Sequence, residues 1–325
     1  MATIEINGKI LSSGAFENQS TITSVKFGSG CNSVGKNAFK KCISLSEIND
    51  DNAIKSIDTG AFGNTALESV TFNELETLKT STFENCSKLS YVNIPNCSIL
   101  YGKPFFNCSN LISIDAKKCI GVETKAFEGC TNLSCVNIPA CLSIPDNMFR
   151  GFRNLTSIKL DNLKNIGYGV FHDCEKLNAI NIKNCEKIIN SAFFNCSSLS
   201  SIYIPNCSNI YPHAFGNCIN LQSVFIGTTS NTRDLSLYIG SCAFSNCQKL
   251  SNINLKLARS IGAGAFSNCI SLKNLDLYNC KIQNSAFAGC KNLSKVSLTN
   301  CTPIGSIKSM NGGIFYGCNN LTSLD

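Results

Sequence analysis

Residues 199–215 read LSSIYIPNCSNIYPHAF, and the spacing of apolar residues in this stretch returns throughout the chain. The leucine opens each unit and a phenylalanine closes it. We call the closing residues anchor phenylalanines: Phe16, Phe39, Phe62, Phe83, Phe105, Phe127, Phe149, Phe171, Phe193, Phe215, Phe244, Phe266, Phe287 and Phe315. Six consecutive intervals between Phe83 and Phe215 are 22 residues, whereas the intervals before Phe244 and Phe315 are 29 and 28. Such a period predicts a solenoid, in which stacked units bury a core that no unit could bury alone.

Each unit carries two local signals. The LxxIxI segment, such as Leu199 to Ile204, alternates apolar and polar residues and predicts a short strand. The Ala-Phe segment predicts one helical turn, because Asn, Gly or Asp stands two residues after the phenylalanine in 13 of 14 units, with Lys41 as the exception. Those residue types tolerate the left-handed conformation that closes a helix. We therefore expect an α/β repeat solenoid: an arc with a parallel β-sheet on its concave face and short helical turns on its convex face.

The 21 cysteines follow the same repeat. A first column stands three residues after an anchor phenylalanine: Cys42, Cys86, Cys108, Cys130, Cys174, Cys196, Cys218, Cys247, Cys269, Cys290 and Cys318. A second column stands eight residues after the leucine: Cys97, Cys119, Cys141, Cys185, Cys207, Cys280 and Cys301. Phe152 and Leu163 replace cysteine in these columns, which favours packing of free thiols in the core over chemistry. Cys31, Cys135 and Cys242 lie outside both columns, and Cys135 is expected to face solvent from its strand.

Composition excludes several functional classes. CxxC pairs are missing and there are two histidines, so we expect no metal site. The net charge of +7 is carried by scattered lysines, which argues against a nucleic-acid partner. The first residues lack the features of a secretion signal, and no stretch reaches the roughly 18–20 apolar residues of a membrane span, so we expect no membrane contact by this segment.

The motif AFxxCxxLxxIxIPxxxxxI, visible from Ala126-Phe127 through Cys130, Leu133 and Pro139 to Ile144, resembles the BspA-like, treponemal-type leucine-rich repeats. The cysteine-rich columns resemble the versions found in parasitic protists. The resemblance covers the whole chain and implies a cell-surface or secreted protein that binds host cells, matrix proteins or other microbes, with a protein or glycoprotein as its ligand. It supplies no catalytic residue and no cofactor, so an enzyme is not expected. The alternative is an intracellular interaction scaffold or sensor, because free thiols suit a reducing compartment.

Candidate binding residues lie on the exposed side of the predicted strands, at the third and fifth positions of LxxIxI. The fifth-position row is mostly polar, with Asp115 and Lys159 among its members, but Tyr203 and Phe225 stand side by side in it. Adjacent exposed aromatic residues are typical of protein interfaces, although cross-strand packing for stability explains them equally well. Tyr91 in the third-position row is a further candidate. The insertion at 227–235, which contains Arg233, follows Phe225 directly, and a second insertion at 302–309 falls at the same place in its repeat.

One sequence cluster resembles a catalytic constellation, Phe171-His172-Asp173-Cys174. The repeat already assigns Cys174 to the first column and Asp173 to the position after the anchor, so no catalytic site is expected there. The whole chain, 1–325, is expected to form a single domain of about 14 coils. Because the last unit stops at its strand without a polar cap, we also expect this chain to be a fragment of a longer protein.

Overall fold

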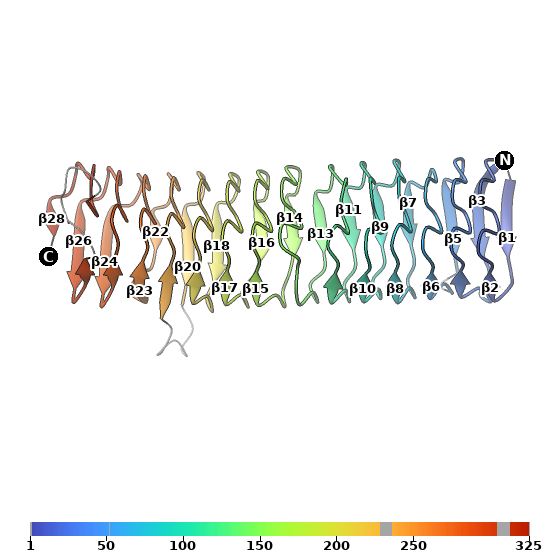
Figure 1. The fold of residues 1–325 in the computed structure, drawn as a ribbon, viewed down its shortest axis with the longest axis horizontal. Coiled ribbons are helices and arrows are strands. Elements are labelled where there is room, and N and C mark those ends of the chain that lie inside the picture. The colour runs from blue at the N-terminus through green and yellow to red at the C-terminus, as the bar shows by residue number, and fades with distance from the viewer. Residues whose placement is uncertain (1, 52, 228–235, 304–312, 325) are drawn as a thin grey trace. The chain divides into compact units, whose positions relative to one another are not determined.

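The computed structural model describes residues 2–51, 53–227, 236–303 and 313–324 (Figure 1). The described chain forms coils of short parallel strands joined by turns, as expected for a repeat solenoid. Most coils contribute a first strand from the LxxIxI segment and a second strand that ends at the aliphatic residue five positions before the anchor phenylalanine. Contacts within the chain define two compact units, Met1–Met148 with Asn154–Leu160, and Phe149–Arg153 with Asp161–Asp325.

The first unit contains two series of strands. Its first strands are β1 (Ala2–Ile6), β3 (Ile22–Phe27), β5 (Glu47–Asp50), β7 (Ser69–Thr71), β9 (Tyr91–Asn93), β11 (Ser113–Asp115), β13 (Cys135–Asn137) and β14 (Ser157–Lys159). β1, β3 and β5 pair in parallel, as do β7, β9, β11, β13 and β14. Its second strands form a six-stranded sheet: β2 (Ile10–Leu11), β4 (Ser33–Val34), β6 (Ser56–Ile57), β8 (Thr77–Leu78), β10 (Ile99–Leu100) and β12 (Gly121–Val122).

The second unit repeats this arrangement. Its first strands are β16 (Ala179–Asn181), β18 (Ser201–Ile204), β20 (Ser223–Ile226), β22 (Asn252–Ile253), β24 (Asn274–Tyr278), β26 (Lys295–Thr299) and β28 (Ser323–Leu324). They include two separate sheets, β18-β20-β22 and β24-β26-β28. Its second strands form one seven-stranded sheet: β15 (Asn165–Ile166), β17 (Lys187–Ile188), β19 (Asn209–Ile210), β21 (Leu237–Ile239), β23 (Ala258–Ile261), β25 (Lys281–Ile282) and β27 (Thr302–Pro303).

The expected helical turns are wrong, because the described residues contain no helix. Around Phe193, alternate N–H groups donate to carbonyls of the following coil, at 2.7–3.0 Å: those of Ser191, Phe193 and Asn195. The N–H groups between them donate to the third residue before, at 3.1–3.2 Å: those of Ala192, Phe194 and Cys196. A 3₁₀-helix needs consecutive bonds of the second kind, so the ladder between coils prevents it.

The left-handed residue after each anchor is nevertheless confirmed. All fourteen residues two positions after an anchor phenylalanine have φ between +57° and +83°, including Lys41 at +61°. The expected curvature into an arc stays a prediction.

Anchor phenylalanines form the centre of the core. In the second unit, the ring centroids of Phe193 and Phe215 lie 5.1 Å apart with an interplanar angle of 1°, and Phe244 follows at 5.2 Å. The same stacking joins Phe16 to Phe39 and the later anchors of the first unit. Since each inner ring packs on the rings before and after it, the core is continuous within a unit and belongs to no single coil.

All 21 cysteines are free, and both predicted columns line the core. One placement was wrong: Cys31 belongs to the second column. It is fully buried, and its Sγ atom points to the carbonyl oxygen of Ser33 at 3.9 Å, as Cys97 points to that of Ile99 at 3.4 Å. Its unit has one extra residue after Ile22, which hid the match. Cys135, expected to face solvent, is half-buried on β13.

Candidate binding surface on the first strands

Tyr203 and Phe225 project from adjacent strands of the second unit. They are direct partners in the parallel pairing of β18 with β20. Their neighbours Ile202, Ile204 and Val224 point into the core, so the alternation of the strand turns both rings outward. Tyr203 is 50% exposed and Phe225 is 42% exposed. The structure thus brings the two aromatic residues together on an open face, while their role in binding stays a prediction.

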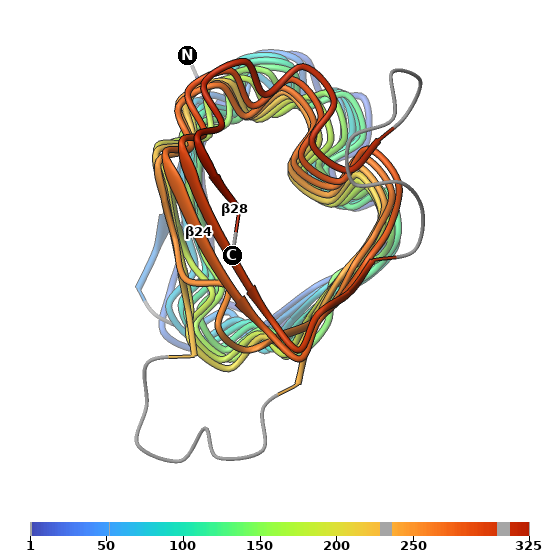
Figure 2. The same ribbon diagram turned by 90° about the vertical axis from the view of Figure 1, so that its left-hand side faces the viewer.

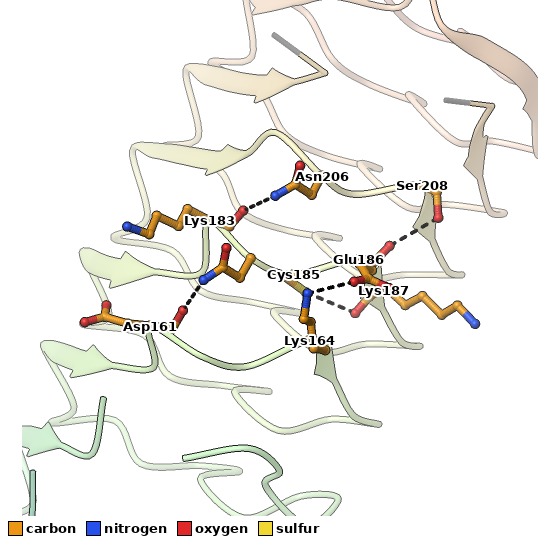
Figure 3. A network of polar contacts seen from close by, with 9 residues as sticks. Asp161, Lys164, Lys183, Cys185, Glu186, Lys187, Asn206 and Ser208 are labelled. Carbon is orange, nitrogen blue, oxygen red and sulfur yellow. Dashed lines mark hydrogen bonds and ion pairs between the residues drawn. The ribbon is translucent and has the colours of Figure 1, made fainter. Parts of the chain in front are cut away.

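Polar contacts join the coils that lead up to Tyr203, at the turns after their first strands (Figure 3). Asn206 donates through Nδ2 to the carbonyl oxygen of Lys183 at 3.0 Å. On the side of the second strands, the Lys164 ammonium lies 3.0 Å from the Glu186 carboxylate, and the Ser208 hydroxyl donates to the Glu186 carbonyl oxygen at 3.4 Å. These bonds join each coil to the next in the part of the unit that leads up to Tyr203.

The other predicted site residues that the structure describes lie in the first unit. In the first unit, Asp115 and Lys159 share one row with Asn137 between them, on β11, β13 and β14. Asp115 is engaged, because Asn137 donates to its carboxylate at 3.0 Å and Lys117 lies 3.5 Å away. Tyr91 on β9 is 41% exposed. Arg233 and most of both predicted insertions lie outside the described residues.

A hollow that the sequence did not predict follows the aromatic pair on the same face of the second unit. Val224 pairs with Ile253, so Asn254 follows Phe225 in the fifth-position row. Asn254 lines a cavity of about 420 Å³, which we call the hollow. Its walls come from the ends of four first strands: Ile253, Asn254, Leu255, Lys256, Asn274, Leu275, Asp276, Lys295, Val296, Ser297 and Ser323.

The coil beside the hollow is one residue shorter than most. Ile210 stands three positions after Cys207, but Ile282 stands two positions after Cys280. The shortened coil has a straight, five-residue strand β24 in place of a strand and a corner. Figure 2 shows β24 and β28 set inward from the outline of the preceding coils of this unit. β22 and β24 belong to different sheets, and the inward position of β24 leaves a step between them.

Of the three charged side chains that line the hollow, two form an ion pair with each other. Lys256 and Asp276 form an ion pair at 3.4 Å across the step. Lys295, on β26, has no carboxylate within ion-pair distance among the described residues. It lies in the third-position row between Asn274 and Ser323, its direct partners on β24 and β28. The shortened Cys280–Ile282 spacing is visible in the sequence, but the hollow beside it appears only in the stacked coils.

The cluster that resembled a catalytic constellation is structural. The Cys174 thiol donates to the carbonyl oxygen of Phe149 at 3.1 Å, and burial raises its pKa far above the ordinary value. A thiol held protonated in this way is a poor nucleophile. The His172 ring stacks on Phe194 at 5.0 Å, and the Asp173 carboxylate lies 2.9 Å from His172 Nδ1.

No group of three or more His, Cys, Asp or Glu side chains among the described residues could hold a metal ion. No helix suited to crossing a membrane occurs in the described ranges.

Comparison with known proteins identifies the repeat. A family model described as a BspA type leucine-rich repeat region of six copies matches residues 9–134, 120–235 and 228–325. A leucine-rich repeat protein from Bacteroides ovatus is 22% identical, with a TM-score of 0.58 and a match covering 99% of this chain and 86% of that chain. The T. pallidum leucine-rich repeat protein is 20% identical over 54% of this chain and 77% of its own, with a TM-score of 0.39. No curated protein matches the chain.

Proposed function

This chain belongs to the BspA type leucine-rich repeat family, and from that premise we propose that it is a macromolecule-binding scaffold that acts in adhesion at the cell surface. The partner is a host or matrix protein or glycoprotein. A solenoid of stacked coils provides a long, rigid strand face, and such faces serve as binding surfaces in repeat proteins. The family membership supports a binding scaffold, and the surface location is part of the proposal.

The observation that carries the proposal is the exposed pair of Tyr203 and Phe225. Each ring keeps about half of its surface in solvent, at 50% and 42% exposure, although every anchor phenylalanine from Phe39 to Phe315 is buried. Aromatic side chains held on a rigid surface are characteristic binding hot spots. The polar fifth-position neighbours Asn181 and Asn254 flank the pair, as a polar rim surrounds the apolar centre of an interface.

The buried thiols are compatible with the proposed surface location. Reduced cysteines favour a reducing compartment only if oxidants can reach them. Cys218 and Cys130 are fully buried, and burial raises the pKa of each thiol to about 12. Such thiols persist in an oxidising environment, so the cysteine content does not argue against exposure at the cell surface.

The binding role is tested with a Tyr203→Ala, Phe225→Ala double variant. Binding of the purified protein to intact epithelial cells and to immobilised extracellular matrix should weaken at least tenfold, since hot-spot residues each contribute at least about 2 kcal/mol. The melting temperature should stay unchanged, because neither ring is in the core. Tyr316→Ala, which removes an equally exposed aromatic ring (53%) next to an anchor phenylalanine, is the matched control and should bind normally.

Retained binding together with a lower melting temperature would show that the pair only stabilises the sheet. Location is tested separately, by staining intact, non-permeabilised cells of the source organism with an antibody to this domain. Labelling only after permeabilisation would establish the intracellular alternative.

A further inference from the structure

We propose that the hollow between β22 and β28 binds an acidic sugar residue, that is, a sugar ring that carries a carboxylate. This inference rests on the proposed adhesive function and names the ligand chemistry of one part of the surface. The hollow lies next to the aromatic pair in the same unit, since Asn254 follows Phe225 in the fifth-position row.

The charge of the hollow selects an anion. The Lys256–Asp276 pair, at 3.4 Å, is neutral as a whole. The Lys295 ammonium has no carboxylate partner among the described residues, so the charged side chains that line the hollow in the described part of the chain sum to +1. Lysine, asparagine and serine side chains stand in one row at Asn274, Lys295 and Ser323, about 4.8 Å from strand to strand. The row offers the charged Lys295 donor beside the neutral amide donor of Asn274, and such a pair suits the two oxygens of a carboxylate.

The rest of the lining suits a polyol. Asn254, Asp276 and Ser297 add acceptors and donors, and hydroxyl groups need both. Beneath them, Leu255, Leu275 and Val296 are at most 6% exposed and form an apolar floor. A sugar ring presents hydroxyl groups at its edge and C–H groups on its face, so it matches this combination of polar walls and apolar floor.

The dimensions favour a single ring over an extended peptide. The lining takes about three residues from a strand, which is roughly 10 Å along the strand, and spans a similar distance across neighbouring strands. The cavity of about 420 Å³ lies in the usual range of small-molecule sites, roughly 300–1,000 Å³. A peptide bound as an added strand would instead need a long, uninterrupted edge, and β22 has only two residues.

The test is an NMR titration of the whole chain with four probes: sodium glucuronate, glucose, inorganic phosphate, and a hexapeptide with a free C-terminal carboxylate. We expect glucuronate to bind in the millimolar range and the other three to bind at least tenfold more weakly. Lys295→Gln should weaken glucuronate binding at least tenfold, because it removes the charged donor but leaves a neutral one. Lys281→Gln, on β25 of the preceding coil, is the matched control and should leave binding unchanged.

Several outcomes would overturn the proposal. These are equal binding of glucose and glucuronate, tighter binding of phosphate or of the peptide, or an equal loss in the two lysine variants. Both lysines are exposed, so circular dichroism should show that both variants keep the fold. The proposed adhesive function has its own readout in the cell and matrix assay of the aromatic double variant. If the protein does not bind glucuronate but the aromatic double variant loses cell and matrix binding, the sugar site is refuted and the adhesive function stands.

Discussion

The Sγ atom of Cys218 lies 3.1 Å from the carbonyl oxygen of Phe193, the anchor phenylalanine of the preceding coil. Each first-column cysteine makes this bond to the anchor before it, at 3.0–3.2 Å. The Phe193 carbonyl also accepts the backbone N–H of Cys196 at 3.2 Å. The column is therefore a line of donors that joins one coil to the next, in addition to filling the core.

This bond predicts that serine replaces Cys218 better than alanine does. Cys218→Ala removes both the buried sulfur and the donor and should lower the free energy of unfolding by about 1–3 kcal/mol. Cys218→Ser keeps a donor at the same place and should cost less. A hydroxyl residue is accepted in this column, since Thr65 stands in it, although the Thr65 hydroxyl donates at 2.9 Å to the carbonyl oxygen of Phe62 in its own coil. Urea unfolding of the three proteins measures the order; alanine equal to or better than serine would contradict it.

The buried thiols also predict a loss of stability at alkaline pH. Burial raises the pKa of Cys97 to about 11 and that of Cys218 to about 12, whereas a thiol in the unfolded chain titrates near 8.5. Above that pH the unfolded state loses protons that the folded state keeps, so the free energy of unfolding falls as pH rises. Between the unfolded and the folded pKa, each thiol lowers the free energy of unfolding by about 1.4 kcal/mol per pH unit. Below about pH 8 its full stabilising effect is present.

Urea midpoints measured between about pH 7 and pH 10 in a reducing buffer check this dependence. Cys218→Ser serves as the control, because a serine hydroxyl does not titrate in this range, and its slope should be shallower by the amount of one thiol. A stability that is flat across the range would show that water reaches the columns.

The repeat itself made the core predictable. Anchor phenylalanines and cysteine columns recur at fixed spacing because every coil buries the same positions. The spacing of these residues in the sequence therefore identifies the buried side chains. The helical turn was wrongly expected for a different reason. The local sequence around Phe193 suits any tight turn, and backbone N–H groups that bond to the following coil prevent a helical one. The hollow was missed because its lining comes from four neighbouring coils, whose relative positions a repeat pattern does not specify.

Close contact between coils predicts a strong effect at Gly262. A Cβ atom there would lie 2.5 Å from the backbone nitrogen of Ser241 and 2.6 Å from the carbonyl carbon of Gly240, both on the preceding coil. Backbone atoms cannot move aside without breaking the ladder, so Gly262→Ala should lower the free energy of unfolding by about 2–3 kcal/mol. Gly121→Ala is the control, because nothing lies within 4 Å of its Cβ position. The melting temperatures of the two variants test this prediction. If Gly262→Ala melts at the same temperature as Gly121→Ala, the coils can separate locally to make room for the added methyl group.

Lys41 predicts a substitution that should stabilise the protein. It is the one lysine in a column of asparagine, glycine and aspartate, yet its φ is +61°, in the left-handed region that disfavours a side chain such as lysine. Its N–H donates to the carbonyl oxygen of Gly63 at 2.8 Å, and this bond holds the residue in that conformation. Lys41→Asn and Lys41→Gly relieve the strain and keep the backbone bond.

Both variants should raise the free energy of unfolding by about 0.5–1 kcal/mol. Asparagine should do at least as well as glycine, because glycine adds freedom to the unfolded chain. The neighbouring Lys40→Gly is the control: it removes a lysine from a residue with ordinary φ and should destabilise the protein. If Lys41→Asn and Lys40→Gly change the urea midpoint in the same direction, the loss of lysine charge, and not the left-handed backbone, controls stability at this turn.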